Sequence, residues 1–424
     1  MARLAENKLI SLSADLAWRG LIKDKTFADA KWLDQPRVFY HGVDASADSL
    51  TIGNLAALLL ARRLIDAGWR AVLLVGGATS LIGDPGGKTA ERALLPRSTI
   101  TKNVTAIKAQ VTQLFAGQDF KLVDNYDWFK SVGYLEFLRE VGKHFSMTEL
   151  MARDFVVERM GEAGSGISYA EFSYSLIQGY DYWQLFKKYG VELQIGGSDQ
   201  WGNMLSGVPL IRKKEGKTVH ALSMPLVVDK ATGRKFGKSE VGAIWLNPAK
   251  TTPTEFYQFW LNVADADVAN YLKVFTFLSK AEIGQVMAEQ RQDAKARAAQ
   301  KRLAVEVTKL VHGGRQGETV TGASKYLTGQ ASLEEASAEG LERLRAEIPA
   351  LKVRVGDSII DALAKSRLAA SKTDARRLLM SGAVYLNGRA TNELLFKKDD
   401  FQNGRLLLRR GKAYKDSALV EIDE

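Results

Sequence analysis

The chain has 424 residues, of which 46% are hydrophobic and 25% are charged, and its formal net charge is +10. This length allows two or three domains, and the composition is that of an ordinary globular protein. The sequence contains no cysteine, which excludes disulfides, thiol catalysis and cysteine-ligated zinc.

The sequence also bears on membranes, metals and charged partners. No apolar run approaches the ~20 residues of a membrane span, and the N-terminus lacks an apolar signal core, so we expect a cytoplasmic protein without a membrane partner. The four histidines lie far apart and show no metal-binding spacing, so we expect no protein-bound metal. The positive net charge favours a polyanionic partner.

The first half of the chain alternates between strand-like and helical patterns. Residues 1–35 are predicted to form an amphipathic helical lead-in. The predicted strands are residues 38–40, 71–75, 120–123, 191–195 and 223–228. This alternation is typical of an α/β fold with a Rossmann-like, mostly parallel sheet and helices on both faces.

Polar or glycine-rich clusters follow four of these strands, at residues 40–54, 76–88, 124–128 and 196–203. Ligands of such folds bind beyond the carboxyl ends of the strands, where these clusters would meet. One glycine-rich turn is weak evidence, but independent loops rarely converge without a shared ligand. We therefore predict a ligand site at this edge of the sheet.

The first cluster ends in a predicted helix start at Thr51, Gly53 and Asn54. Helix starts carry free N–H groups and a partial positive charge, which suit phosphate, and Gly53 permits close approach. Taken alone, the stretch is best interpreted as a capped strand–loop–helix connection. The later polar clusters are what support its interpretation as part of a ligand site.

The second cluster nearly matches a P-loop, from Gly83 to Lys88 and Thr89, but it is one residue too short. No dinucleotide fingerprint follows the first strand either. A nucleotide site would therefore be divided between the helix start at Gly53 and a basic loop at residues 230–240. That loop suits a phosphate clamp, although an exposed basic turn would look the same.

A long, mostly helical insertion is predicted at about residues 129–190. Tyr174, Gln178 and Asp181 fall at positions i, i+4 and i+7 of a helix and so share one face. Such a face belongs either to solvent or to a pocket wall. Ile177 and Tyr180 indicate close packing nearby and favour the pocket wall.

The second half of the chain is predicted to be helical from about 250 to 345, with a basic, solvated periodic stretch at 282–311. Residues 329–350 are polar and acidic and are predicted to be a linker or a weakly ordered segment.

The last block, residues 351–424, holds 15 lysines and arginines against 10 aspartates and glutamates. We predict a helix at 357–367, a second helix capped by Ser371 or Thr373, a tight turn at Asn387-Gly388, and basic strands at 405–412. A helix pair with arginines beside a small sheet suits RNA backbone binding, and an inert basic domain is the alternative.

Together these motifs resemble the bacterial tyrosyl-tRNA synthetases, which are class I aminoacyl-tRNA ligases, over the whole chain. Residues 51–54 stand where the family carries His-Ile-Gly-His, and residues 235–239 stand where it carries Lys-Met-Ser-Lys-Ser. The Tyr174–Gln178–Asp181 stripe and the Gly-Gly-Ser-Asp-Gln-Trp-Gly-Asn run at 196–203 resemble the tyrosine-binding and ribose-binding motifs and are the more specific signals.

The resemblance implies a domain order. Residues 1–230 would form the Rossmann-like catalytic domain with its helical insertion, and residues 231–328 an α-helical anticodon-binding-type domain that begins with the lysine loop. Residues 329–350 would be a linker, and residues 351–424 a small α+β domain of the S-four type, which binds RNA.

The resemblance also implies an activity. L-Tyrosine would react with ATP, accompanied by Mg²⁺, to give tyrosyl-adenylate and diphosphate, and tyrosine would then pass to the 3′ end of tRNA(Tyr). The family is dimeric, and the insertion at about 127–166 resembles its usual interface, so a homodimer is implied.

The site residues implied by the resemblance fall into four groups. The tyrosine-binding set is Tyr40, Thr79, Asp84, Asn125, Tyr174, Gln178, Asp181 and Gln200, with Gln194 as a further pocket residue. The ATP-binding set is Asp44, Gly53, Lys88, Arg92, Gly197, Asp199, Lys235 and Lys238. The catalytic set is Thr51, Asn54, Lys235 and Lys238, and the RNA-binding set is Lys372, Arg376, Arg377, Arg409 and Arg410.

One departure from the family pattern bears on activity. Thr51 and Asn54 replace both signature histidines, and Ala45-Ser46 stand where Pro-Thr is usual. Our hypothesis is that neutral donors suffice; the competing one is a synthetase-like RNA-binding protein without aminoacylation. A tryptophan-specific relative is a third reading, but Tyr40 with Asp181 favours a phenol over an indole.

Overall fold

The structure is a computed structural model that describes residues 10–84, 94–161, 166–228, 238–239, 242–327, 331–411 and 416–423. At 154–155, 238–239 and 242 only the backbone is described. The chain divides into two compact units, Met1–Lys250 with Ala264–Ala294, and Thr251–Val263 with Lys295–Glu424. The predicted helical domain at 231–328 is therefore shared between the two units.

The first unit is built on a six-stranded sheet in the order β1-β6-β5-β2-β3-β4. Its parallel strands are β2 (Val38–Asp44), β3 (Arg70–Gly76), β4 (Phe120–Asp124), β5 (Leu193–Gly197) and β6 (His220–Met224), and β1 (Asp24–Lys25) pairs antiparallel at one edge. Four strands lie where the sequence predicts them. The fifth was predicted at 223–228 but runs from His220 to Met224, because Pro225 cannot donate to a strand ladder.

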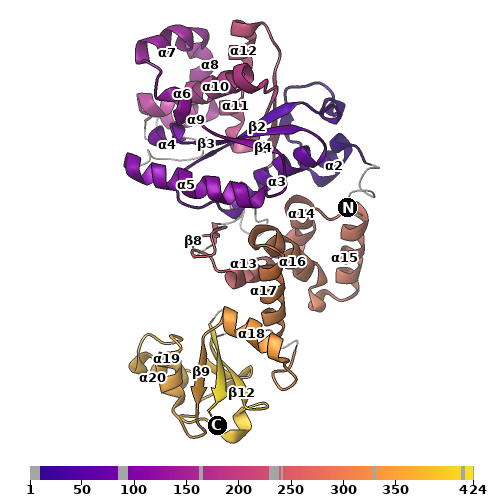
Figure 1. The fold of residues 1–424 in the computed structure, drawn as a ribbon, viewed down its shortest axis with the longest axis vertical. Helices are drawn as coiled ribbons and strands as arrows, with labels where there is room; N and C mark the ends of the chain where they lie inside the picture. Colours follow the sequence, from indigo (N-terminus) through magenta and orange to yellow (C-terminus); the bar gives the residue numbers. More distant parts are fainter. Residues whose placement is uncertain are drawn as a thin grey trace. The chain divides into compact units, whose positions relative to one another are not determined.

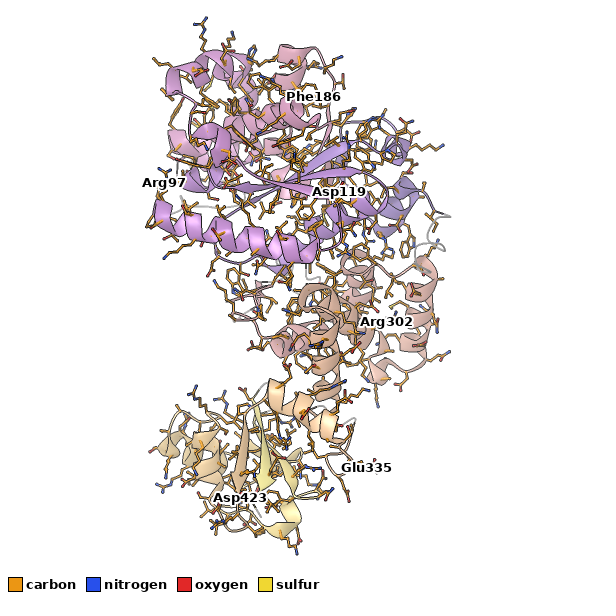
Figure 2. The ribbon with its side chains drawn as sticks, in the orientation of Figure 1. Arg97, Asp119, Phe186, Arg302, Glu335 and Asp423 are labelled. Carbon is orange, nitrogen blue, oxygen red and sulfur yellow. The ribbon has the colours of Figure 1, made fainter. Side chains whose placement is uncertain are left out.

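Helices cover both faces of this sheet (Figure 1). The helices α3 (Ile52–Asp66) and α5 (Arg97–Leu114) lie on one face, and α10 (Tyr169–Tyr189) and α12 (Gly207–Glu215) lie on the other. The leucines at positions 55, 58, 59 and 64 form an apolar stripe on α3, and all four are buried. On the opposite face, Tyr40 and Val72 share a core with Tyr182, and Phe186 of α10, labelled in Figure 2, packs against it.

The strand order locates the ligand crevice. The chain builds β2, β3 and β4 outward in one direction and then returns to add β5 and β6 on the other side of β2. The order therefore reverses between β2 and β5, where Tyr40 is paired with Gln194. Open parallel sheets bind ligands at this kind of reversal, at the carboxyl ends of the strands.

The remaining helices of the first unit surround this sheet. The lead-in contains α2 (Leu12–Arg19), and α4 (Thr79–Ile82) and α11 (Trp201–Met204) follow strand ends. The predicted insertion is helical and contains α7 (Tyr134–Glu140), α8 (Met147–Met151) and α9 (Asp154–Met160) before α10, while α6 (Tyr126–Phe129) precedes it. The helices α14 (Asp265–Phe275) and α15 (Lys280–Gln292) complete the unit.

The second unit joins helices to a small sheet. Its helices are α13 (Pro253–Leu261), α16 (Ala298–His312), α17 (Gly314–Leu327), α18 (Ala338–Glu347), α19 (Ile359–Lys365) and α20 (Lys372–Met380). Its sheet has the order β11-β10-β12-β13-β9, with β9 (Ala350–Val353), β10 (Val384–Leu386), β11 (Arg389–Thr391), β12 (Arg405–Arg410) and β13 (Ser417–Ile422). The stretch predicted as one periodic run at 282–311 is broken between α15 and α16, where Arg297 has a positive φ of 52°.

The segment predicted as a linker, residues 329–350, contains the helix α18. Its Leu341 and Leu344 are buried in a core with Leu407 of β12 and Leu419 of β13. Leu406 and Leu408 point the other way, into a core with α19 and α20. Both faces of the small sheet are therefore apolar, and α18 covers the second face, which is why this polar segment is ordered.

In the last block, the predicted serine cap and the predicted tight turn are confirmed. The side chain of Ser371 accepts a hydrogen bond from the backbone N–H of Asp374 at the start of α20. The pair Asn387-Gly388 has positive φ angles of 47° and 83° in the tight turn between β10 and β11.

Among the described residues, no helix is long and apolar enough to cross a membrane.

Candidate active site

A cavity of about 380 Å³ lies at the carboxyl ends of β2 and β5. It is lined by residues of three of the four clusters that the sequence predicts to converge. The predicted site residues that line it are Tyr40, Asp44, Thr51, Gly53, Asn54, Thr79, Asp84, Tyr174, Gln178, Asp181, Gln194, Gly197, Asp199 and Gln200. The helical stripe of α10 is thus a pocket wall, as predicted.

The structure does not describe the side chains of four predicted site residues, so their positions relative to this cavity are not given. Lys88, Arg92 and Lys235 lie outside the described residues, and Lys238 is described only by its backbone, in the short strand β7 (Lys238–Ser239). A fifth, Asn125 of the third cluster, does not line the cavity but bonds to residues that do.

Asp44, at the end of β2, connects two pocket walls. The Tyr174 hydroxyl donates to its Oδ2 at 2.8 Å, and the Thr79 hydroxyl donates to its Oδ1 at 2.6 Å. A Cβ at Gly76 would lie 2.3 Å from this Oδ1, so a glycine is required for the contact. Asp44, predicted in the ATP set, is thus bonded to two residues of the tyrosine set.

Asp181 lies at the buried end of the cavity and is only 2% exposed. The indole N–H of Trp128 donates to its Oδ1 at 2.8 Å, and the amide of Asn125 donates to its Oδ2 at 3.0 Å. Burial raises the pKa of Asp181 to about 8, although these two hydrogen bonds lower it. Trp128 was missed as a site residue; its place in the third polar cluster was the available signal.

Two polar atoms close to Asp181 are buried without a partner among the described residues. They are the hydroxyl of Tyr40 and Oε1 of Gln194, neighbours across β2 and β5. Burial, followed by the negative charge of Asp181, raises the pKa of Tyr40 well above its usual value, so its hydroxyl stays protonated. A buried polar group left unpaired costs about 1–3 kcal/mol, which a ligand hydroxyl would recover.

Asp84 follows β3 in the sequence and also lines the cavity. Its Oδ2 accepts from Nε2 of Gln200 at 2.6 Å, and its Oδ1 accepts from Nδ2 of Asn203 at 3.2 Å. This bond brings together the second and fourth clusters, as predicted. Asn203 was not assigned a role from the sequence, although it closes the Gly-Gly-Ser-Asp-Gln-Trp-Gly-Asn run.

The two residues at the signature positions bond to each other at the start of α3. Both the backbone N–H and the hydroxyl of Thr51 donate to Oδ1 of Asn54, each at 3.0 Å. The carboxamide oxygen of Asn54 is thus occupied, and its NH₂ group is the donor left for a ligand. The Gly53 position is open, because a Cβ built there would meet only the Thr51 hydroxyl, at 3.5 Å.

His41 also lines the cavity and was not predicted to do so. Its Nδ1 lies 3.1 Å from the carbonyl oxygen of Ile195, which can only accept, so Nδ1 carries a proton. Burial lowers the pKa of His41, so the ring is neutral at pH 7 and offers Nε2 as an acceptor. The available sequence signal was its position in the first polar cluster, one residue after Tyr40.

The predicted RNA-binding residues lie in the second unit. Arg376 and Arg377 are exposed on α20, and Arg377 donates to Asp374 at 2.7 Å. Arg410 of β12 also lowers the pKa of Asp374, after the stronger effect of Arg377, so helix and strand cations are near neighbours. Arg409 lies 5.2 Å above the ring of Tyr385, and Lys372 pairs with Asp361 at 2.9 Å.

The cavity lining combines chemically distinct groups. It includes the buried hydroxyl, carboxyl and amide groups of Tyr40, Asp181 and Gln194. It also includes the start of α3, with its neutral donors. Within the described residues, no group of histidines and acidic residues could hold a metal ion.

Comparisons with known proteins identify the family to which this chain is similar. The family model for tRNA synthetases class I (W and Y) matches residues 33–327, and the model for the tyrosine--tRNA ligase SYY-like C-terminal domain matches residues 340–415. A tyrosine--tRNA ligase of Streptomyces avermitilis is 44% identical over 418 residues, which cover 96% of this chain and 98% of the relative. One of Anaeromyxobacter dehalogenans is 44% identical over 419 residues, with the same coverage.

A solved structure shows the same fold. A C-terminally truncated mitochondrial tyrosyl-tRNA synthetase of Aspergillus nidulans superimposes with a TM-score of 0.68 and 32% sequence identity. The match covers 77% of this chain and 96% of that one.

Proposed function

The chain belongs to the tyrosine–tRNA ligases of the class I tRNA synthetases, and from this we propose which residues of its cavity bind each part of tyrosine and ATP during tyrosine activation. The enzyme joins L-tyrosine to ATP as tyrosyl-adenylate, releasing diphosphate, and then transfers tyrosine to tRNA(Tyr). The observation that carries the pocket assignment is the Tyr40 hydroxyl, which lies beside the buried Asp181 and has no partner in the part of the chain that the structure describes.

The phenol of the substrate binds between Tyr40 and Asp181. Tyr40 is a protonated hydroxyl with no partner among the described residues, and Asp181 is held in place by Trp128 and Asn125. A phenol hydroxyl completes this set of hydrogen bonds. Phenylalanine has no hydroxyl and would leave buried polar groups unpaired, so the site discriminates against it.

The substrate ammonium group binds to Tyr174, Gln178 and Asp84. All three line the cavity, and the Asp84 carboxylate accepts hydrogen bonds from neutral amides. Thr79 and Asn125 support this region through hydrogen bonds to Asp44 and Asp181. Gln200 is placed beside Asp84, near the substrate carboxylate.

The ATP ribose binds to Gly197 and Asp199, and the phosphates lie at the start of α3. The tyrosine carboxylate, already ionised, attacks the α-phosphorus, so the reaction needs no general base and depends on alignment and charge stabilisation. The donors at α3 are the N–H of Gly53 and the NH₂ of Asn54. Lys235 and Lys238 hold the leaving diphosphate, with Lys88 and Arg92 in support, and Mg²⁺ arrives with ATP.

Two parts of the chain serve tRNA. The helices of 231–328, which are divided between the two units, act as the anticodon-binding-type domain. In the second unit, α20 and β12 contact the RNA backbone through Lys372, Arg376, Arg377, Arg409 and Arg410. Exposed positive charges on one small domain are the footprint of backbone binding. The active protein is a cytoplasmic homodimer.

Support for the homodimer comes from an exposed apolar surface on the insertion, which we call the insertion face. Its members are exposed tyrosine, leucine, methionine and valine side chains: Tyr134, Leu135, Met147, Met151, Val157, Met160 and Tyr169. These exposed apolar side chains lie along one segment of the chain, and exposed apolar patches are typical of interfaces. A second copy of the chain is the proposed partner.

The test is ATP–diphosphate exchange with tyrosine, run beside phenylalanine and tryptophan. We expect exchange with tyrosine alone, which would show that Thr51 and Asn54 replace the signature histidines. Folded protein that binds tRNA but shows no exchange with any amino acid would refute the enzyme and leave an RNA-binding protein.

A further inference from the structure

The first turn of α3 is hydrogen-bonded to the segment that follows the lysine motif, which we call the anchor segment (residues 244–247). The Ile52 N–H donates to the Ile244 carbonyl at 3.1 Å, and the Leu246 N–H donates to the Leu50 carbonyl at 2.8 Å. Thr51 and Trp245 form an antiparallel bridge between them. Backbone hydrogen bonds therefore join the anchor segment to the start of α3.

A serine hydroxyl at the centre of this junction has every hydrogen bond that it can make. The Ser49 hydroxyl donates to the Leu50 carbonyl at 2.9 Å. It accepts from Nε2 of Gln110 at 3.0 Å and from the Asn247 N–H at 3.2 Å. A hydroxyl has one donor and two acceptor sites, so this geometry is fully determined. Ser49 is 5% exposed, and water cannot readily replace these partners.

Gln110 is a residue of α5, one of the helices that cover the sheet, and it connects this helix to the junction. Its Oε1 accepts from the Leu50 N–H at 2.8 Å while its Nε2 bonds Ser49. Seven residues earlier on the same helix face, Asn103 donates to the Ala45 carbonyl at 2.9 Å. Two amides of one helix thus hold both ends of the loop between β2 and α3.

We propose that Gln110 and Ser49 are positioning residues for adenylate formation. They align the start of α3 with the anchor segment and so set the geometry of the donors at Gly53 and Asn54, although neither Gln110 nor Ser49 lines the cavity. This inference rests on the proposed function. It predicts an effect on the rate of activation that is separate from tyrosine binding, because Tyr40 and Asp181 make no contact with this junction.

The chain offers a graded set of variants. Gln110→Leu removes both amide bonds, and Gln110→Glu keeps an acceptor for the Leu50 N–H but loses the donor to Ser49. Ser49→Ala removes the acceptor of Nε2 of Gln110 and of the Asn247 N–H, while the bond from the Leu50 N–H to Oε1 of Gln110 remains. Gln113→Leu is the matched control, because Gln113 is exposed on the same helix.

We expect Gln110→Leu to lower kcat of ATP–diphosphate exchange by roughly 10- to 100-fold, with an unchanged KM for tyrosine. Gln110→Glu should restore part of the rate, and Gln113→Leu should match wild type. A Gln110→Leu enzyme with wild-type kcat would overturn the proposal, as would a loss of kcat, tyrosine affinity and melting temperature in step with one another.

Backbone hydrogen exchange of the unliganded protein tests the junction without using activity. The amides of Ile52, Leu246 and Asn247 should exchange faster in Gln110→Leu than in wild type or Gln113→Leu. Unchanged exchange at these amides refutes the anchoring whatever the kinetics show. Inactive wild-type protein would instead refute the proposed function, and the junction would then be judged by exchange alone.

Discussion

Asp181 is a buried carboxyl group whose charge changes in an accessible pH range. Its pKa is raised to about 8 by burial, whereas an unfolded aspartate titrates near 4. The folded protein therefore binds this proton more tightly than the unfolded chain does. Stability from this residue is complete below pH 4 and is lost as the pH rises toward 8.

Asp181→Asn should remove this pH dependence. We expect the unfolding free energy of the variant, relative to wild type, to rise between pH 5 and pH 8, with a slope of at most about 1.4 kcal/mol per pH unit. Urea unfolding across this range measures it. A constant difference between the two proteins would contradict the raised pKa, and Asp127→Asn, at an exposed position, is the control.

Thr51 and Asn54 should contribute unequally to activation. The Thr51 hydroxyl already donates to Oδ1 of Asn54, whereas the Asn54 NH₂ remains for phosphate. Asn54→Ala should therefore lower kcat of exchange by roughly 10- to 100-fold, the value of a hydrogen bond to a charged group. Thr51→Ala should cost less. Equal losses, or a larger loss for Thr51→Ala, would contradict the assignment of the Asn54 NH₂ as the main donor to phosphate.

At the scale of elements, α20 shows how a short helix can present charge. Ser371 caps its start, Ala375 and Leu379 bury one side against the small sheet, and Arg376 and Arg377 remain exposed on the other. Because capping and burial hold the helix in place, its arginines are presented on a rigid surface. Contacts of this kind release counterions from RNA, so their number is read from salt dependence.

Replacing Arg376 and Arg377 together by alanine should weaken tRNA binding and reduce the slope of log affinity against log salt by about 1–2. Tyrosine-dependent ATP–diphosphate exchange should stay at the wild-type rate, because it does not require tRNA. Lys398→Ala, at another exposed cation of the domain, is the control. An unchanged salt slope would remove α20 from the proposed RNA surface.

At the scale of the whole molecule, the proposed homodimer depends on the insertion face. Leu135 of α7 is 79% exposed and Val157 of α9 is 58% exposed. Leaving such side chains in water is unfavourable by roughly 25 cal/mol for each Å² of apolar surface. A second copy would bury them.

Leu135→Glu combined with Val157→Glu should convert the dimer to a monomer, which sedimentation equilibrium would detect. Val355→Glu, which alters an exposed apolar side chain of the C-terminal domain, should leave the mass unchanged. A wild-type protein that sediments as a monomer would refute the homodimer directly.

Local patterns in the sequence were sufficient for much of the fold and for part of the site. Strand–helix alternation predicts the parallel sheet, the i, i+4, i+7 spacing predicts the pocket wall on α10, and Asn387-Gly388 predicts a turn. These features depend on backbone conformation and periodic burial, which neighbouring residues determine. The polar clusters also identify the edge of the sheet at which the cavity lies.

Only the tertiary structure decided the pairings between distant residues. It brings the Trp128 indole to Asp181 and joins Gln110 to Ser49. It also places the Tyr40 hydroxyl and Oε1 of Gln194 on neighbouring strands, with no hydrogen-bond partner for either among the described residues. It also orders α18, because the second face of the small sheet must be covered. Such contacts arise from packing between elements far apart in the chain, and no local pattern specifies which buried polar group will meet which.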